Sequence, residues 1–148
     1  MTGRLWLVIA DGEHARFVTP APKRAFHTQR AMESPSAHKR SSDLGTDRPT
    51  MSVESATGTR HAITPKHDLH DMEKRKFAEQ VAHEINRASG QGAFDRLVVV
   101  APTHTLNEIR AQLDATTTAK LAGTLPKELI KVPDHELASH LYEWALDD

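Results

Sequence analysis

The pattern of apolar and polar positions predicts a sheet that opens with a β-hairpin. Leu5–Ala10 is a continuous apolar run, as expected for a strand that is buried on both faces. Asp11-Gly12 follows as a turn signal, and Ala15–Thr19 then alternates in the manner of a half-buried strand. After two prolines, Ala25–Ala31 predicts a third and weaker strand.

The second half of the chain alternates helices with strands. Apolar residues at helical spacing predict a long helix from about Asp68, as its N-cap, to Ser89, where glycines stop it. We expect four further elements: a buried strand at Leu97–Ala101, a helix from a Thr105/Glu108 capping box to about Leu113, a strand at Leu121–Leu125, and a last helix that Asp134 opens and that buries Leu137 and Leu141.

This order predicts one α/β domain over residues 1–148. A hairpin followed by alternating helices and strands implies a mixed sheet of about four to five strands that is flanked by helices. Between the hairpin and the long helix lies a polar segment, about residues 34–67, which we interpret as a long loop. Compact domains rarely keep a structureless loop longer than ~15 residues unless it has a function or is disordered. The functional hypotheses therefore concentrate on this loop and the helix start, Ser34–Asp71.

Composition narrows the functional classes. The 148 residues include no cysteine, which excludes disulfides, thiolate nucleophiles and cysteine metal sites. The formal net charge of −1 gives no global basic field of the kind that marks many nucleic-acid proteins. No apolar run approaches the ~18 residues of a membrane span, and the N-terminal residues lack a signal-peptide pattern. We expect a cytoplasmic protein without a membrane span.

The polar segment carries cations that suit phosphate binding. Arginine offers a planar fork for phosphate oxygens, and displaced counterions would make such binding sensitive to salt. Aromatic side chains that stack on bases are missing from the segment. The candidate RNA- or ligand-binding residues are Arg48, Arg60, His61, Lys66, Lys74 and Arg75, with Arg40 nearby.

Two groups have the residue types of a metal site. The most metal-like cluster consists of His67, His70 and Asp71, with His61 upstream. We favour a simpler interpretation, in which the acidic residues lie in the first turn of a helix and the histidines are exposed neighbours. Asp11 ends the first strand, where some nucleases place a metal-binding carboxylate, although hairpin chemistry explains it more simply. We expect no metal and no cofactor, and the P-loop and G-x-G-x-x-G motifs are absent.

Several motifs taken together resemble a bacterial family named "protein required for attachment to host cells". They lie in the hairpin, in the polar segment and around the later strands: Val8–Gly12 with Ala15–Phe17, Asp47–Pro49, Gly58–Ala62, Phe94–Pro102 and Leu125–Leu129. The resemblance covers nearly the whole chain. The family name implies an effect on host attachment, which we interpret as indirect.

The family is also distantly similar to the middle domain of archaeo-eukaryotic peptide-chain release factors and Pelota. That similarity implies an RNase H-like or release-factor-like fold. In release factors a Gly-Gly-Gln loop precedes a long helix and enters the ribosomal peptidyl-transferase centre. This chain has no Gly-Gly-Gln, and Gly58-Thr59-Arg60-His61 stands roughly in its place.

We therefore predict a non-enzymatic accessory factor that contacts the ribosome, tRNA or rRNA through Ser34–Asp71. One alternative is a metal-dependent hydrolase or nuclease that uses Asp11 or the histidine cluster. Another is a protein-interaction module that affects adhesion. Trp144 and Tyr142 are interpreted as packing residues or as a contact between two copies of the chain.

Overall fold

Five strands form one mixed sheet in the computed structural model, which describes the backbone of residues 3–44 and 63–146 and the side chains of residues 3–39 and 69–146. The strand order is β3-β2-β1-β4-β5. The strands are β1 (Leu5–Ala10), β2 (His14–Ala21), β3 (Ala25–Glu33), β4 (Arg96–Val100) and β5 (Leu121–Leu125). The first three are antiparallel neighbours, whereas β4 runs parallel to both β1 and β5. The predicted α/β class and the opening hairpin are confirmed.

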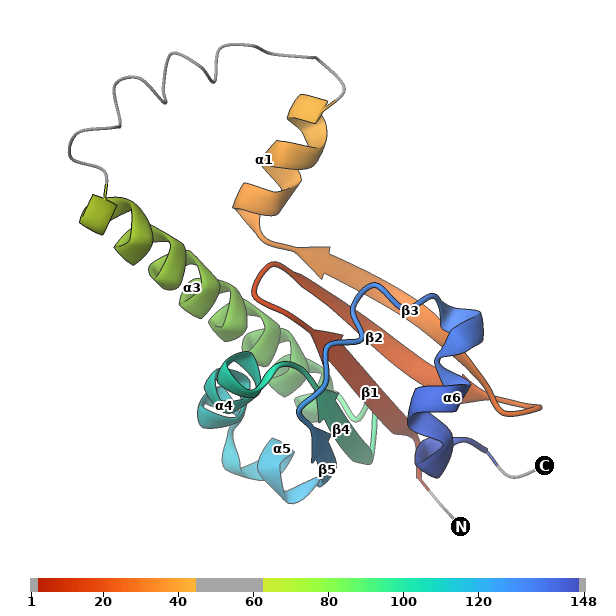
Figure 1. Cartoon of the computed structure of the whole chain (residues 1–148). Coiled ribbons are helices and arrows are strands. Elements are labelled where there is room, and N and C mark those ends of the chain that lie inside the picture. The colour runs from red at the N-terminus through yellow and green to blue at the C-terminus, as the bar shows by residue number, and fades with distance from the viewer. Residues whose placement is uncertain (1–2, 45–62, 147–148) are drawn as a thin grey trace.

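Helices cover one face of this sheet (Figure 1). They are the long helix α3 (Ile63–Gly90), followed by α4 (Thr103–Gln112) and α5 (Ala115–Ala119). Phe77, Val81 and Ile85 of α3 are almost fully buried and belong to the same cluster as Val8 and Val99 of the central strands. The burial of several such side chains, each contributing about 1.5–3 kcal/mol, stabilises this helix on the sheet.

The C-terminal segment covers the other face without a long helix. It contains Asp134–Glu136 (η1), Ala138–Leu141 (α6) and Tyr142–Trp144 (η2). Leu129, Leu137 and Leu141 pack in a second cluster that includes Leu7 and Val98 of the sheet. The burial of Leu137 and Leu141 is as expected, but the prediction of a single last helix was wrong.

Arg16 explains why Asp134 does not simply open a helix. Its guanidinium donates to the carbonyls of Leu129, Ile130 and Val132 at 3.2, 3.1 and 2.6 Å, and to the Asp134 carboxylate at 2.6 Å. Asp134 also accepts bonds from the Thr28 amide and hydroxyl, at 2.8 and 2.6 Å. This network holds an irregular segment against the sheet. The Asp134 carboxylate therefore joins two parts of the fold and does not cap a helix.

Helices occupy both ends of the predicted loop at about 34–67. Helix α1 occupies Pro35–Leu44, and α3 begins at Ile63. The prediction that Asp68 is the N-cap of the long helix was therefore wrong. The Ser34 hydroxyl accepts a bond from the Ala37 amide at 3.1 Å, which caps α1, and Pro35 suits the first helical position. Pro65 falls in the first turn of α3, where its missing amide proton is not needed.

Two smaller expectations also failed. Helix α4 begins at Thr103, two residues before the predicted capping box, and Pro102 at its N-cap makes no side-chain cap. Thr105 is instead buried inside the helix. Helix α5 was not predicted because its consecutive threonines favour strands, yet Asp114 caps it by accepting a bond from the Thr117 amide at 2.8 Å. Among the described residues, no helix is long and apolar enough to cross a membrane.

Replacing Asp134 should loosen the C-terminal segment in a pH-dependent way. Partial burial opposes the charge of Asp134, but the bonds from Thr28 and Arg16 outweigh it and lower the pKa of this carboxyl. Because the side chain is still 38% exposed, we expect Asp134→Asn to cost about 1–2 kcal/mol at pH 7. A carboxyl whose pKa is lowered on folding stabilises the folded state at pH values above its unfolded pKa of ~3.9. This contribution is lost as the pH falls through the pKa of the folded state. Urea unfolding should therefore separate the variant from the wild type at pH 7 and much less near pH 3.

The exposed Glu136→Gln is the matched control for this substitution, because among the described residues its carboxylate contacts only the neighbouring His135, at 3.5 Å. Equal stabilities of the Asp134→Asn and Glu136→Gln variants at pH 7 would contradict the structural role of the network.

Removing the Ser34 hydroxyl should destabilise α1. Ser34 is 3% exposed, and its backbone amide also donates to the Glu13 carbonyl at 2.8 Å. We expect Ser34→Ala to cost about 1 kcal/mol and to speed hydrogen exchange at the Ala37 amide, because an N-cap acceptor is lost. Ser36→Ala, inside the same helix, is the control, and identical exchange at Ala37 in both variants would rule out the cap.

Candidate functional site

The candidate site lies at the carboxyl edge of the parallel strands β1 and β4. In sheets of this kind, ligands commonly bind outside the carboxyl ends of the strands. Here the chain leaves β1 through the turn at Asp11 and Gly12. The helices α1 and α3 rise beyond the same edge (Figure 1).

Asp11 organises the turn at this edge. Its Oδ1 atom accepts bonds from the amides of Glu13 and His14, at 2.8 and 2.7 Å. A carboxylate that accepts two nearby amides is a turn-forming group, as hairpin chemistry predicts for Asp11. Within the described part of the chain, no three residues of the metal-ligating types gather around a common position.

Lys74 packs directly over this turn. A Cβ atom at Gly12 would lie 2.9 Å from the Lys74 Cγ atom, so only glycine leaves room for the lysine stem. The stem is thereby held against the hairpin while the side chain stays exposed. This contact places one of the predicted cations at the carboxyl edge.

Arg75 faces a different neighbour, helix α4. Its Nε atom lies 3.7 Å from Oε2 of Glu108, which His104 also approaches at 3.3 Å. The Arg75 side chain is 64% exposed, so this ion pair contributes little energy and leaves the guanidinium open to other anions. Lys74 and Arg75 therefore present two separate positive groups near the start of the buried part of α3.

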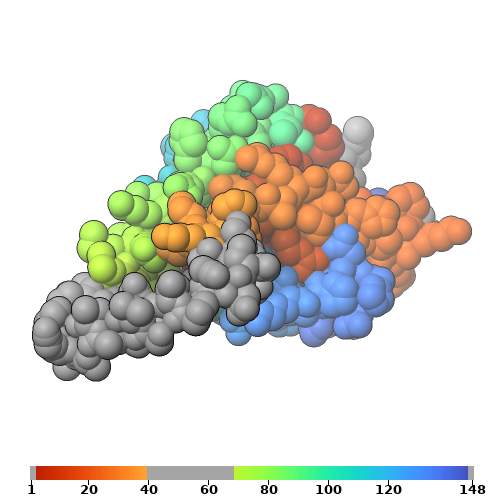
Figure 2. All heavy atoms as spheres, turned by 90° about the horizontal axis from the view of Figure 1, so that it is seen from above, coloured from red at the N-terminus to blue at the C-terminus, as the bar shows by residue number. Residues whose placement is uncertain are grey.

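The first half of α3 projects beyond the sheet. Every residue from 69 to 76 is exposed, and burial begins at Phe77. At 1.5 Å per residue, the part before Phe77 is about 20 Å long. In Figure 2 this exposed stretch of α3 forms the yellow-green surface at the left of the described atoms. The exposed face includes two large apolar side chains, Leu69 at 57% and Met72 at 49%.

The other predicted residues are only partly placed. His70 and Asp71 lie on the exposed surface of α3. Lys66 and His67 lie within the same helix, but the structure describes only their backbone. Arg48, Arg60 and His61 fall within 45–62 and also lie outside them, and nothing is described of the Arg40 side chain. The predicted pairing of His67 with Asp71 stays a prediction.

Sequence reasoning missed a group of alternating charges beside the turn. His14 lies between Asp11, 3.6 Å from its Nδ1 atom, and Glu33, 3.9 Å from its Nε2 atom. Glu33 also contacts His38 Nδ1 at 2.9 Å. The hairpin register brings His14 opposite Glu33, although 18 residues separate them along the chain. Counting outward from the turn between Ala21 and Ala25 would pair His14 with Met32, because a bulge between Phe17 and Val18 shifts the register by one residue.

Comparison with known proteins agrees with this architecture. The crystal structure of an archaeal translation termination factor, aRF1, superposes with a TM-score of 0.55 at 10% sequence identity. The match covers 97% of this chain and 35% of that chain, so this chain spans about a third of the factor's length. At this identity the match concerns the fold alone. Among curated proteins, none matches the chain.

A family model matches most of the sequence. It is described as "Protein required for attachment to host cells" and aligns with residues 6–141, from the second residue of β1 to the end of α6. The aligned region therefore includes the whole sheet except Leu5, together with both helices that frame the candidate site. The chain belongs to this family of proteins required for attachment to host cells.

Proposed function

We propose that this protein is a cytoplasmic accessory factor that binds the ribosome or RNA through the Ser34–Asp71 segment and the exposed start of α3. The observation that carries the proposal is the projecting half of α3, which presents Lys74 and Arg75 on a fold similar to that of a translation termination factor. Among the described side chains of α3, burial in the core begins at Phe77, so the core does not use residues 69–76.

The charges suit a phosphate backbone. Lys74 and Arg75 remain exposed on two sides of the helix, where each can approach a separate phosphate. Arg48, Arg60, His61 and Lys66 precede them along the chain and would extend the same surface. Contacts of this kind position a protein on RNA without reading its sequence.

Peptide release is not part of the proposal, because the sequence contains no Gly-Gly-Gln. The factor would occupy or sense a ribosomal site rather than hydrolyse the peptidyl-tRNA ester. An effect on attachment to host cells would then be indirect, through the translation of other proteins.

Neutralising the predicted cations should weaken ribosome binding. We expect salt-sensitive co-sedimentation of the wild-type protein with ribosomes, and weaker binding by Arg48→Gln/Arg60→Gln and by Lys74→Gln/Arg75→Gln. Each lost phosphate contact should reduce the slope of log affinity against log salt by about 0.7–0.9. Centrifugation across a salt series measures both quantities.

The matched control is Arg87→Gln/Arg110→Gln, which removes the same charge. Arg87 lies 12 residues beyond Arg75 on α3, or about 18 Å along the axis, and Arg110 is in the last turn of α4. An equal loss of binding in the control pair would indicate a general charge effect. Unchanged binding in both test pairs, when folded, would overturn the assignment of these residues.

A second candidate function is recognition of a protein partner. Leu69 and Met72 are three residues apart on α3 and so share a face, and both are exposed. Binding that survives ribonuclease treatment and high salt but is lost in Leu69→Ser/Met72→Ser would favour this candidate. The hydrolase alternative predicts instead a metal-dependent cleavage of RNA that disappears in Asp11→Asn, a substitution that keeps an acceptor for the turn.

A further inference from the structure

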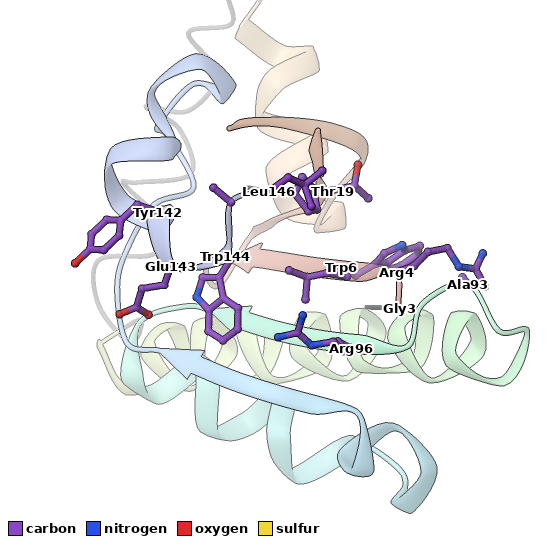
Figure 3. A pocket seen from close by; sticks show the side chains of 13 residues that line it. Gly3, Arg4, Trp6, Thr19, Ala93, Arg96, Tyr142, Glu143, Trp144 and Leu146 are labelled. Carbon is purple, nitrogen blue, oxygen red and sulfur yellow. The ribbon is translucent and has the colours of Figure 1, made fainter. Parts of the chain in front are cut away.

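The amino edge of the sheet, opposite the candidate RNA surface, holds a hollow of about 830 Å³. It lies between the beginnings of β1 and β4, the end of β2 and the C-terminal turn η2 (Figure 3). Its wall combines apolar groups such as Leu5, Pro20 and Trp144 with the charged side chain of Arg96. This combination makes the hollow a candidate for a ligand with both a flat apolar part and a charged part.

Arg96 is the unusual member of this wall. It is the first residue of β4 and is partly buried, and its guanidinium lies over the Trp144 ring at 5.9 Å from the ring centre. No carboxylate, carbonyl or hydroxyl among the described residues accepts a bond from it. Removing a guanidinium from water without giving it an acceptor costs free energy, which an oxyanion in the hollow would recover.

Other arginines of the structure show that the fold normally provides acceptors. Arg16 reaches three carbonyls and a carboxylate, and Arg30 pairs with Glu84 at 3.0 Å. Arg4, also at the edge of the hollow, donates to the Gly92 carbonyl. Among these arginines, Arg96 alone lines a large hollow with its donors unused.

Trp144 supplies a flat surface whose position is fixed. A Cβ atom at Gly123 would lie 2.8 Å from the Trp144 Cζ2 atom, so the indole rests on the backbone of β5 at a place where only glycine fits. Its Nε1 atom is buried without a hydrogen-bond partner. In Figure 3 the Arg96 guanidinium points toward this indole, whereas Tyr142 and Glu143 point away from Arg96. The nearest carboxylate of the wall therefore does not oppose an anion at Arg96.

We propose that this hollow binds a small molecule that carries an oxyanion on a flat ring system. The fork of Arg96 would hold the phosphate or carboxylate, because planar bidentate recognition suits both groups. The ring would lie against Trp144 and the apolar wall, where stacking on an aromatic side chain contributes without selecting one ring. The site is independent of the proposed RNA surface, since it lies at the other end of β1 and β4.

The test uses the full chain and two pairs of probes. Adenosine 5′-monophosphate is compared with adenosine, and indole-3-acetate with indole-3-acetamide, so that each pair differs in the oxyanion. Two-dimensional NMR follows the two indole N–H signals, which Trp6→Phe assigns. We expect at least one charged probe to shift the Trp144 signal and to bind about tenfold or more tightly than its neutral counterpart.

Variants then locate the binding site. Arg96→Gln should abolish the preference for the charged probe, and Arg96→Lys, which keeps the charge but loses the fork, should retain part of it. Gly123→Ala should weaken both members of a pair, because it displaces the indole. Arg110→Gln is the control and should bind like the wild type.

Three results would overturn the proposal: no shift with either charged probe at millimolar concentration, equal binding of charged and neutral probes, or an unchanged preference in folded Arg96→Gln. The outcome is separable from that of the proposed function, because Arg96→Gln should leave ribosome co-sedimentation unchanged.

Discussion

The fold depends on two adjacent parallel strands that are apolar on both faces. Leu7, Val8 and Ile9 of β1 and Val98, Val99 and Val100 of β4 are all 0% exposed. Both faces of the sheet must therefore be covered, since an uncovered face would expose apolar area at a cost of about 25 cal/mol per Å². Helices cover one face with regular periodicity. The other is covered by an irregular segment whose carbonyls need donors from outside, and Arg16 provides them.

The exposed stretch of α3, residues 69–76, has no role in this core. The helix is 28 residues long, but its buried face begins at Phe77. Among the described side chains of α3, those of residues 69–76 are not buried against the sheet, so the core places few constraints on their composition. Its exposed Leu69 and Met72 lie next to Lys74 and Arg75, so this stretch presents both apolar and positively charged side chains to the solvent.

Much of this architecture follows from sequence periodicity, and the failures have identifiable causes. The buried strands were found because continuous Val and Leu runs admit few alternatives, and the core face of α3 because its spacing is regular. The start of α3 was misplaced because Asp68 and Asp71 look like first-turn residues, and because a proline such as Pro65 more often marks a loop than a helix. Helix α1 has few apolar residues, so its existence depends on Ser34, which is anchored by the distant turn at Glu13.

The candidate sites were predicted less well, because they depend on contacts across the chain. Lys74 and Arg75 were named from sequence, but the close approach of Lys74 to Gly12 joins residues that are 62 positions apart. The Arg96 hollow had no sequence signal, because an arginine before an apolar strand looks like an ordinary exposed boundary. Only the tertiary structure shows that no described residue accepts a hydrogen bond from its guanidinium.

A comparison of Arg16 with Arg96 explains how one layer holds both an arginine with several acceptors and an arginine without one among the described residues. Both side chains enter the layer between the sheet and the C-terminal segment. Over Arg16, residues 129–132 pass with their carbonyls turned toward the guanidinium. Over Arg96, the turn at Tyr142–Trp144 presents an indole ring, which attracts a cation but accepts no conventional hydrogen bond from it. The guanidinium at one end of the layer thus has hydrogen-bond acceptors, whereas the one at the other end has none among the described residues. The chain segment that crosses above each arginine makes the difference.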